Sequence, residues 1–183
     1  MNVIEVSVPA ALANALFLLV LVFLPMLIEA RRAARNERFQ RGRGGVEPSG
    51  DVYRLMQVAY PGVFTAMIFE GALGGAGASS RLWAAGLALF LAAKTLKWWA
   101  IVSLGPFWTF RVIIVPGSAP VRRGPYRFLR HPNYIGVVGE LVGAALMAGA
   151  RVAGPIGTVL FCALMLRRVV VENRALDAIL RRS

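Results

Sequence analysis

The chain has 183 residues, 57% of them hydrophobic, and a mean hydropathy of +0.62. A soluble domain of this length needs a polar exterior, so this composition excludes an ordinary soluble fold and predicts an all-α integral membrane protein with a single domain, residues 1–183. The net charge is +12, from 21 Lys and Arg against 9 Asp and Glu. The basic residues stand at the ends of apolar runs, which favours orientation signals and contacts with anionic membrane lipid over nucleic-acid binding.

Metal-binding side chains are scarce in this sequence. It contains one cysteine, Cys162, and one histidine, His131. An intrachain disulfide therefore cannot form, and a metal site with several thiolate or imidazole ligands is excluded. We expect no metal ion.

Five apolar runs predict about five transmembrane helices. In chain order the runs cover residues 10–28, 55–73, 82–104, 135–150 and 152–166. The last two are separated only by Arg151, with Gly154 and Pro155 close behind, which predicts a tight helical hairpin. The long polar connection over residues 105–134 is expected to lie on the cytosolic membrane interface.

The orientation follows from the positions of arginine. Arginine-rich segments follow the first run, occupy the 105–134 connection and begin again at Arg167, whereas the other two loops contain only Arg81 and Arg151. With five spans, the three basic segments fall on one side of the membrane. The positive-inside rule assigns that side to the cytosol, with the N-terminus outside and the C-terminus in the cytosol.

Several ionisable residues lie within or next to the apolar runs. Lys94 and Lys97 are three residues apart on one helix face, and we expect their long stems to reach toward the interface. Glu140 lies inside the fourth run, where a charge costs roughly 2.5–3.5 kcal/mol, so it should face the bundle interior. Its expected partner is Arg168, Lys94 or Lys97. We also expect Glu140 to meet Glu172 at the cytosolic end.

Two glycines in the fourth run are spaced for close helix packing. Gly139 and Gly143 lie four residues apart on one face, and this pair allows two helices to approach closely. Met147 occupies the next position of the row, so we expect only a short groove of small residues.

The start of the fourth run predicts a polar pocket. Pro132 suits the first turn of a helix, which places His131 immediately before that helix. A helix start offers unpaired N–H groups that favour a carboxylate, and Arg130 and His131 add hydrogen-bond donors. A purely structural interpretation is also open, in which these residues anchor the helix at the interface and Tyr126 and Tyr134 are belt aromatics.

Two motifs resemble those of the isoprenylcysteine carboxyl methyltransferase family, which belongs with the membrane phospholipid methyltransferases. The first motif is Gly124-Pro125-Tyr126-Arg127 followed by Arg130-His131-Pro132-Asn133-Tyr134-x-Gly136. The second is Glu172 followed by Leu176, with Asn173 where the family commonly has a second acid. The resemblance covers about residues 98–180 and is closer to a small bacterial branch associated with alkylpyrone-type products.

This resemblance implies S-adenosylmethionine as cofactor, bound at the cytosolic end of the last two helices. The expected cofactor-contacting residues are Tyr126, Arg130, His131, Pro132, Asn133, Tyr134 and Glu172. The expected catalytic residues are Arg168, near the acceptor, and Glu140.

The predicted function is methyl transfer to a carboxylate, enol or phenol oxygen of a lipophilic acceptor, at the cytosolic face of a bacterial inner membrane. Displacement at a sulfonium needs positioning and a dry site rather than a nucleophilic triad. Aromatic faces such as that of Trp108 can stabilise the positive sulfur, and arginines can hold the acceptor anion.

Two alternatives remain at this stage. The Arg-His-Pro-Asn-Tyr string also resembles membrane sterol and enone reductases, whose NADPH phosphates the arginines of residues 122–130 could bind. Those enzymes have more spans and an acidic motif near the end, which this tail lacks. The second alternative is a non-enzymatic lipid-binding membrane protein that has kept the helical hairpin.

Overall fold

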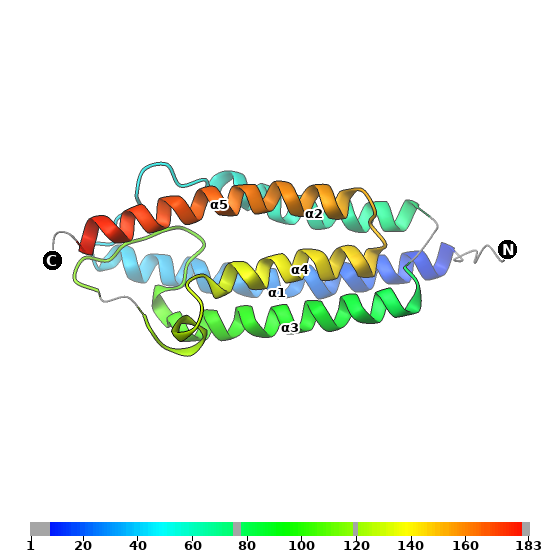
Figure 1. Ribbon diagram of the computed structural model, residues 1–183, viewed down its shortest axis with the longest axis horizontal. Helices are drawn as coiled ribbons and strands as arrows, with labels where there is room; N and C mark the ends of the chain where they lie inside the picture. The colour runs from blue at the N-terminus through cyan, green and yellow to red at the C-terminus, as the bar shows by residue number, and fades with distance from the viewer. Residues whose placement is uncertain (1–7, 75–77, 119–120, 181–183) are drawn as a thin grey trace.

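The computed structural model describes residues 8–74, 78–118 and 121–180, which form five long helices lying side by side (Figure 1). These are α1 (Val8–Gly42), α2 (Tyr53–Leu73), α3 (Ser80–Leu104), α4 (Pro132–Ala148) and α5 (Ala153–Leu180). Two short 3-10 helices, η1 (Gly105–Phe107) and η2 (Gly124–Arg127), lie in the connection between α3 and α4. The all-α prediction is confirmed.

Three of the described helices are long and apolar enough to cross a membrane. They cover Ala10–Gly42, Ser80–Phe107 and Ala153–Arg174, and α4 is a shorter apolar helix. The protein is therefore an integral membrane protein by length and composition. The first helix runs well past its apolar part because residues 29–42 are mostly Ala, Arg, Glu and other helix formers. This polar extension projects about 20 Å beyond the apolar segment.

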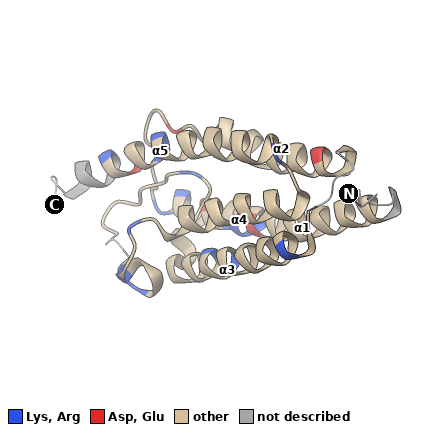
Figure 2. Cartoon of the chain, turned by 45° about the vertical axis from the view of Figure 1, so that its right-hand side comes forward, with Lys and Arg blue, Asp and Glu red and all other residues tan. Residues whose placement is uncertain are grey.

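The helices are arranged so that all three basic segments lie at one end. Helix α3 packs most extensively on α4, while α2 contacts α1, α4 and α5. Residues 43–52, 105–118 and 121–131 and the C-terminal part of α5 gather at the end opposite the N-terminus (Figure 1). Basic residues of η2 and α5 are visible there (Figure 2). We call this the arginine-rich end, because the three basic segments share this end of the bundle.

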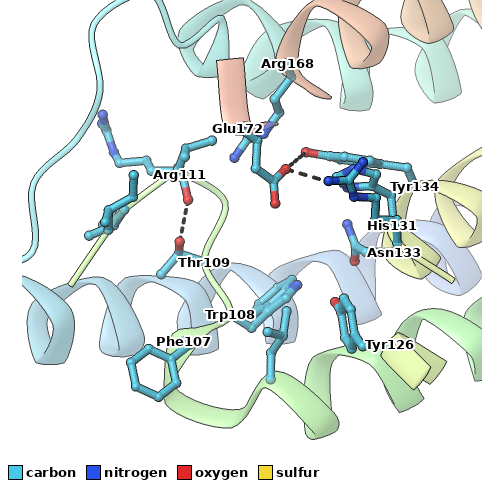
Figure 3. A pocket seen from close by; sticks show the side chains of 15 residues that line it. Phe107, Trp108, Thr109, Arg111, Tyr126, His131, Asn133, Tyr134, Arg168 and Glu172 are labelled. Atoms are coloured by element: carbon cyan, nitrogen blue, oxygen red, sulfur yellow. Dashed lines mark hydrogen bonds and ion pairs between the residues drawn. The ribbon is translucent and has the colours of Figure 1, made fainter. Parts of the chain in front are cut away.

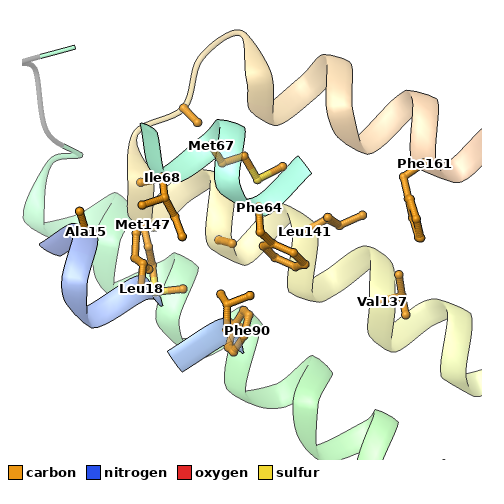
Figure 4. Packing of buried hydrophobic residues seen from close by; sticks show 14 of the residues in the cluster. Ala15, Leu18, Phe64, Met67, Ile68, Phe90, Val137, Leu141, Met147 and Phe161 are labelled. Atoms are coloured by element: carbon orange, nitrogen blue, oxygen red, sulfur yellow. The ribbon is translucent and has the colours of Figure 1, made fainter. Parts of the chain in front are cut away.

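The centre of the bundle is filled by apolar side chains from every long helix (Figure 4). The largest buried members include Leu18 of α1, Phe64 and Met67 of α2, Phe90 of α3, Leu141 and Met147 of α4, and Phe161 of α5. Many other Leu, Val and Ile side chains stay exposed on the outer helix faces. Lipid is their expected solvent, so this outer surface fits a membrane-embedded bundle.

Glycine permits the close contact between α3 and α4. A Cβ atom on Gly143 would lie 2.7 Å from the carbonyl oxygen of Gly86 and 2.8 Å from the amide nitrogen of Phe90. A Cβ atom on Gly139 would lie 2.6 Å from the Cβ of Ala93. The predicted role of Gly139 and Gly143 is confirmed, and Gly86 supplies the matching small residue on α3.

Replacing Gly143 by valine is expected to lower the free energy of unfolding by roughly 1–3 kcal/mol, because the new side chain would push against the backbone of α3. Reversible unfolding in mixed detergent micelles measures this change. The matched control is Gly62→Val in α2, where an added Cβ meets nothing within 4 Å. Equal stability of the two variants would contradict the close approach of α3 and α4.

Candidate functional site

A cavity of about 150 Å3 lies at the arginine-rich end, between the start of α4, the C-terminal half of α5 and the segment after α3 (Figure 3). It is lined by Leu104, Phe107, Trp108, Thr109, Arg111, Val112, Ile113, Ile114, Tyr126, Arg130, His131, Asn133, Tyr134, Arg168 and Glu172. Seven of the nine site residues predicted from sequence are among them. Pro132 and Glu140 are not.

Helix α4 begins in a way that turns His131 toward the cavity. Pro132 occupies the first helical turn, and His131 is the N-cap residue, but the imidazole makes no capping hydrogen bond. Its Nδ1 atom lies 3.9 Å from Oε2 of Glu172 on α5. The hydroxyl of Tyr134 donates to the same oxygen at 3.0 Å, and its ring stacks on His131. The two predicted motifs, 38 residues apart, therefore meet at one carboxylate.

Two buried polar atoms beside this carboxylate have no partner in the described part of the chain. They are Nε2 of His131 and Oδ1 of Asn133. An unmade hydrogen bond at a buried polar atom costs about 1–3 kcal/mol, so buried polar groups in native proteins are nearly always satisfied. Both residues line the cavity, so a polar ligand bound there could satisfy them.

The 3-10 helix η2 brings Tyr126 to the opposite wall. Gly124 starts this turn with a φ of +59°, and a side chain there would overlap Ser103 of α3, so glycine is required. Pro125 follows in the first turn of η2. Burial, and then the nearby Glu172 carboxylate, raises the pKa of the Tyr126 phenol. The phenol therefore remains a hydrogen-bond donor at neutral pH.

The polar extension of α1 holds the segment that closes one side of the cavity. The side-chain amide of Asn36 donates to the carbonyl oxygens of Gly105 and Trp108, at 3.0 and 2.7 Å. The Gln40 amide donates to Pro106 at 2.9 Å. These contacts fix Trp108, which is only 3% exposed. The sequence interpretation missed both amides, although their four-residue spacing on one helix face was a usable signal.

The loop between α1 and α2 ties down the next part of this segment. Val46 and Ile114 exchange two backbone hydrogen bonds of 2.9 Å, which form an isolated bridge within the β-branched residues 112–115. Arg111 pairs with Glu47 at 2.9 Å and with Glu37 at 3.3 Å. Burial acts to raise the pKa of Glu47, but hydrogen bonds from Arg111 and Arg41 outweigh it and lower that pKa. This wall of the cavity is therefore held by charge as well as by backbone pairing.

Glu140 lies outside the cavity, in a cluster of buried charges that joins four helices. Its carboxylate is 2.9 Å from Lys94 and 3.3 Å from Lys97 of α3. Glu29 of α1 contacts the same lysines at 3.2 and 2.7 Å. The Tyr60 hydroxyl of α2 donates to Glu140 at 2.5 Å. We call these five residues the intramembrane ion cluster.

This cluster corrects two expectations. Lys97 is 2% exposed and turned inward, so the expectation that the lysines reach toward the interface is wrong. Glu29 and Glu140 pair with both ammonium groups inside the bundle, and a buried charge needs such a partner. The expected pairing of Glu140 with lysine is confirmed, but its meeting with Glu172 is wrong, because Glu172 belongs to the cavity.

Arg168 is placed in the cavity wall as the sequence predicted. Its side chain is 8% exposed and donates a hydrogen bond to the carbonyl oxygen of Phe110. It precedes Glu172 by four residues on α5, so both face the cavity. The side chain of Leu176, part of the second motif, lies outside the described residues.

Comparisons with known proteins agree with this geometry. The model of the isoprenylcysteine carboxyl methyltransferase family matches residues 86–178, about half of the chain, including both motifs. The chain is 28% identical over 160 residues to the uncharacterized protein YpbQ of Bacillus subtilis (strain 168), covering 87% of this chain and 95% of the relative. It is 23% identical over 150 residues to an uncharacterized protein of Haemophilus influenzae (strain ATCC 51907 / DSM 11121 / KW20 / Rd), covering 81% and 87%. No solved structure matches significantly.

Proposed function

Because this chain belongs to the isoprenylcysteine carboxyl methyltransferase family, we propose that it transfers the methyl group of S-adenosylmethionine to an oxygen of a lipophilic acceptor. The family is one of membrane methyltransferases, which agrees with the helical membrane fold. One observation supports the proposal above the others. The two sequence motifs line a single cavity and meet where Tyr134 donates to Glu172.

The cavity residues fit the chemical groups of this cofactor. Nε2 of His131 and Oδ1 of Asn133 have no hydrogen-bond partner among the residues that the structure describes, so they can bind polar atoms of a ligand. The Glu172 carboxylate can accept hydrogen bonds from hydroxyl or ammonium groups, and Arg130 can pair with a carboxylate. When bound, S-adenosylmethionine supplies an electrophilic methyl group on a positively charged sulfur. The aromatic faces of Trp108 and Tyr126 can stabilise such a charge.

The chain itself needs to do little chemistry beyond positioning. The segment around Trp108 and Phe110, held by α1, excludes water from one side of the cavity. Arg168 can hold an acidic acceptor oxygen as its anion. Such an oxygen arrives deprotonated and needs no general base, which favours a carboxylate, an enol or an acidic phenol.

The positions of charge and the source of the relatives support a location for the reaction. The arginine-rich end is placed in the cytosol by the positive-inside rule, so the water-soluble cofactor would enter there. Both relatives come from bacteria, which favours a bacterial inner membrane. The acceptor and the surrounding membrane lipid are the expected partners.

Purified protein in nanodiscs is expected to bind S-adenosylhomocysteine, the product form of the cofactor, and not NADPH. Isothermal titration calorimetry measures both affinities under the same conditions. In addition, tritium from S-adenosyl-[methyl-3H]methionine should enter a product soluble in organic solvent when a bacterial lipid extract supplies the acceptor. Binding of NADPH without S-adenosylhomocysteine would replace this proposal with the reductase. Binding of neither would favour a non-enzymatic protein.

A further inference from the structure

The Asp51 carboxylate contacts three separate elements at the arginine-rich end. Asp51 precedes α2, and its side chain is only 3% exposed. Its Oδ1 atom accepts a hydrogen bond from the amide of Tyr53 at 3.1 Å, and its Oδ2 accepts one from the amide of Val112 at 3.1 Å. Oδ1 also lies 3.7 Å from Nη1 of Arg168 on α5. One buried carboxylate thus joins α2, the segment over the cavity, and α5.

These contacts determine which acid Arg168 pairs with. Arg168 and Glu172 lie four residues apart on α5, a spacing at which opposite charges on a helix commonly pair. Among the described residues, however, the ion pair of Arg168 is with Asp51, and Glu172 interacts with Tyr134 and His131. Arg168 therefore forms its ion pair with Asp51 instead of with the acid four residues along its own helix. A planar guanidinium can contact Asp51 and the Phe110 carbonyl at once and still present N–H groups to the cavity.

We propose that Asp51 is a positioning residue for methyl transfer, which holds Arg168 at the acceptor end of the cavity and leaves Glu172 available to the cofactor. This inference rests on the proposed function. Asp51 lies outside the residues that line the cavity, so it acts through Arg168 rather than on a ligand. A buried carboxylate suits this task because it compensates the arginine charge and fixes its direction.

A double-mutant cycle with Arg168 tests this assignment. Asp51→Asn is expected to lower tritium transfer into the lipid extract by roughly 10-fold, since a misplaced binding group costs rate steeply. The affinity for S-adenosylhomocysteine should stay within about twofold, because residues other than Arg168 hold the cofactor. The double variant Asp51→Asn/Arg168→Gln should be no slower than Arg168→Gln alone, within about twofold, because coupled residues are not additive. A double variant whose transfer rate falls by the product of the two single-variant factors would overturn the proposal.

The matched control is Glu47→Gln. Glu47 lies in the same loop and holds the same segment through Arg111, but it has no contact with Arg168 among the described residues. The factor by which Glu47→Gln lowers tritium transfer should multiply with the factor for Arg168→Gln in the double variant. Coupling between Glu47 and Arg168 as strong as that between Asp51 and Arg168 would overturn the specific role of Asp51.

Should Asp51→Asn fail to fold, Arg168→Lys is the second variant, since lysine keeps the charge but lacks the planar guanidinium that reaches Asp51 and the Phe110 carbonyl through separate nitrogens. It should lose acceptor turnover and keep cofactor affinity, whereas unchanged turnover would overturn the proposal. Wild-type protein that binds no S-adenosylhomocysteine would instead refute the proposed function, so the two failures are distinguishable.

Discussion

Replacing His131 by alanine is expected to lower methyl transfer about 100-fold or more, with a near-normal yield of folded, membrane-inserted protein. The imidazole makes no capping hydrogen bond to α4, so the helix does not need it. His131 lines the cavity, its buried Nε2 atom has no hydrogen-bond partner among the described residues, and its Nδ1 lies near Glu172. Losing a group that orients the cofactor misplaces the reacting atoms, and a displacement of about 1 Å can cost 100-fold in rate.

The tritium transfer assay measures this loss, and calorimetry with S-adenosylhomocysteine shows whether cofactor binding falls with it. The control is Phe128→Ala, which changes a side chain that is 76% exposed and does not line the cavity. Should the His131→Ala protein retain full activity, His131 would be only an anchor at the start of α4, which is the structural interpretation of the motif.

Replacing Lys97 by methionine is expected to lower the free energy of unfolding by about 3–5 kcal/mol, because it leaves Glu29 and Glu140 facing a single lysine. Reversible unfolding in mixed detergent micelles measures this change. The double variant Lys97→Met/Glu29→Leu leaves Lys94 paired with Glu140 and should recover much of the loss. A double variant as unstable as the sum of the single variants would contradict charge pairing as the source of stability.

The same cluster decides the role of Glu140. Glu140→Leu is expected to impair function. The loss can come from less folded protein or from a lower activity per folded molecule, and the two are measured separately. The ion cluster joins α1, α2, α3 and α4 but lies outside the cavity, so the geometry favours a loss of folded protein. Unchanged specific activity in the folded fraction would remove Glu140 from the catalytic residues.

Local patterns in the sequence were sufficient to predict the helices and where the motifs lie on them. Apolar runs and flanking arginines predicted an all-α membrane bundle with its basic segments on one side, because lipid solvation and charge placement act on each segment separately. Pro132 likewise predicted the start of α4, since its missing N–H costs nothing in the first turn. The resemblance of the two motifs placed His131 and Glu172 in one site, 41 residues apart in the chain.

Only the tertiary structure decided which charges pair. The sequence did not specify whether Lys97 reaches the interface or pairs with one of several acids. It also contained no pattern that linked Asp51 to Arg168. The structure pairs Lys97 with Glu29, 68 residues away, and Asp51 with Arg168, 117 residues away. A buried charged side chain pairs with the opposite charge that helix packing brings to the same level of the bundle and turns toward it. That outcome depends on helix register, which close contacts such as Gly143 against Gly86 fix and which no local pattern contains.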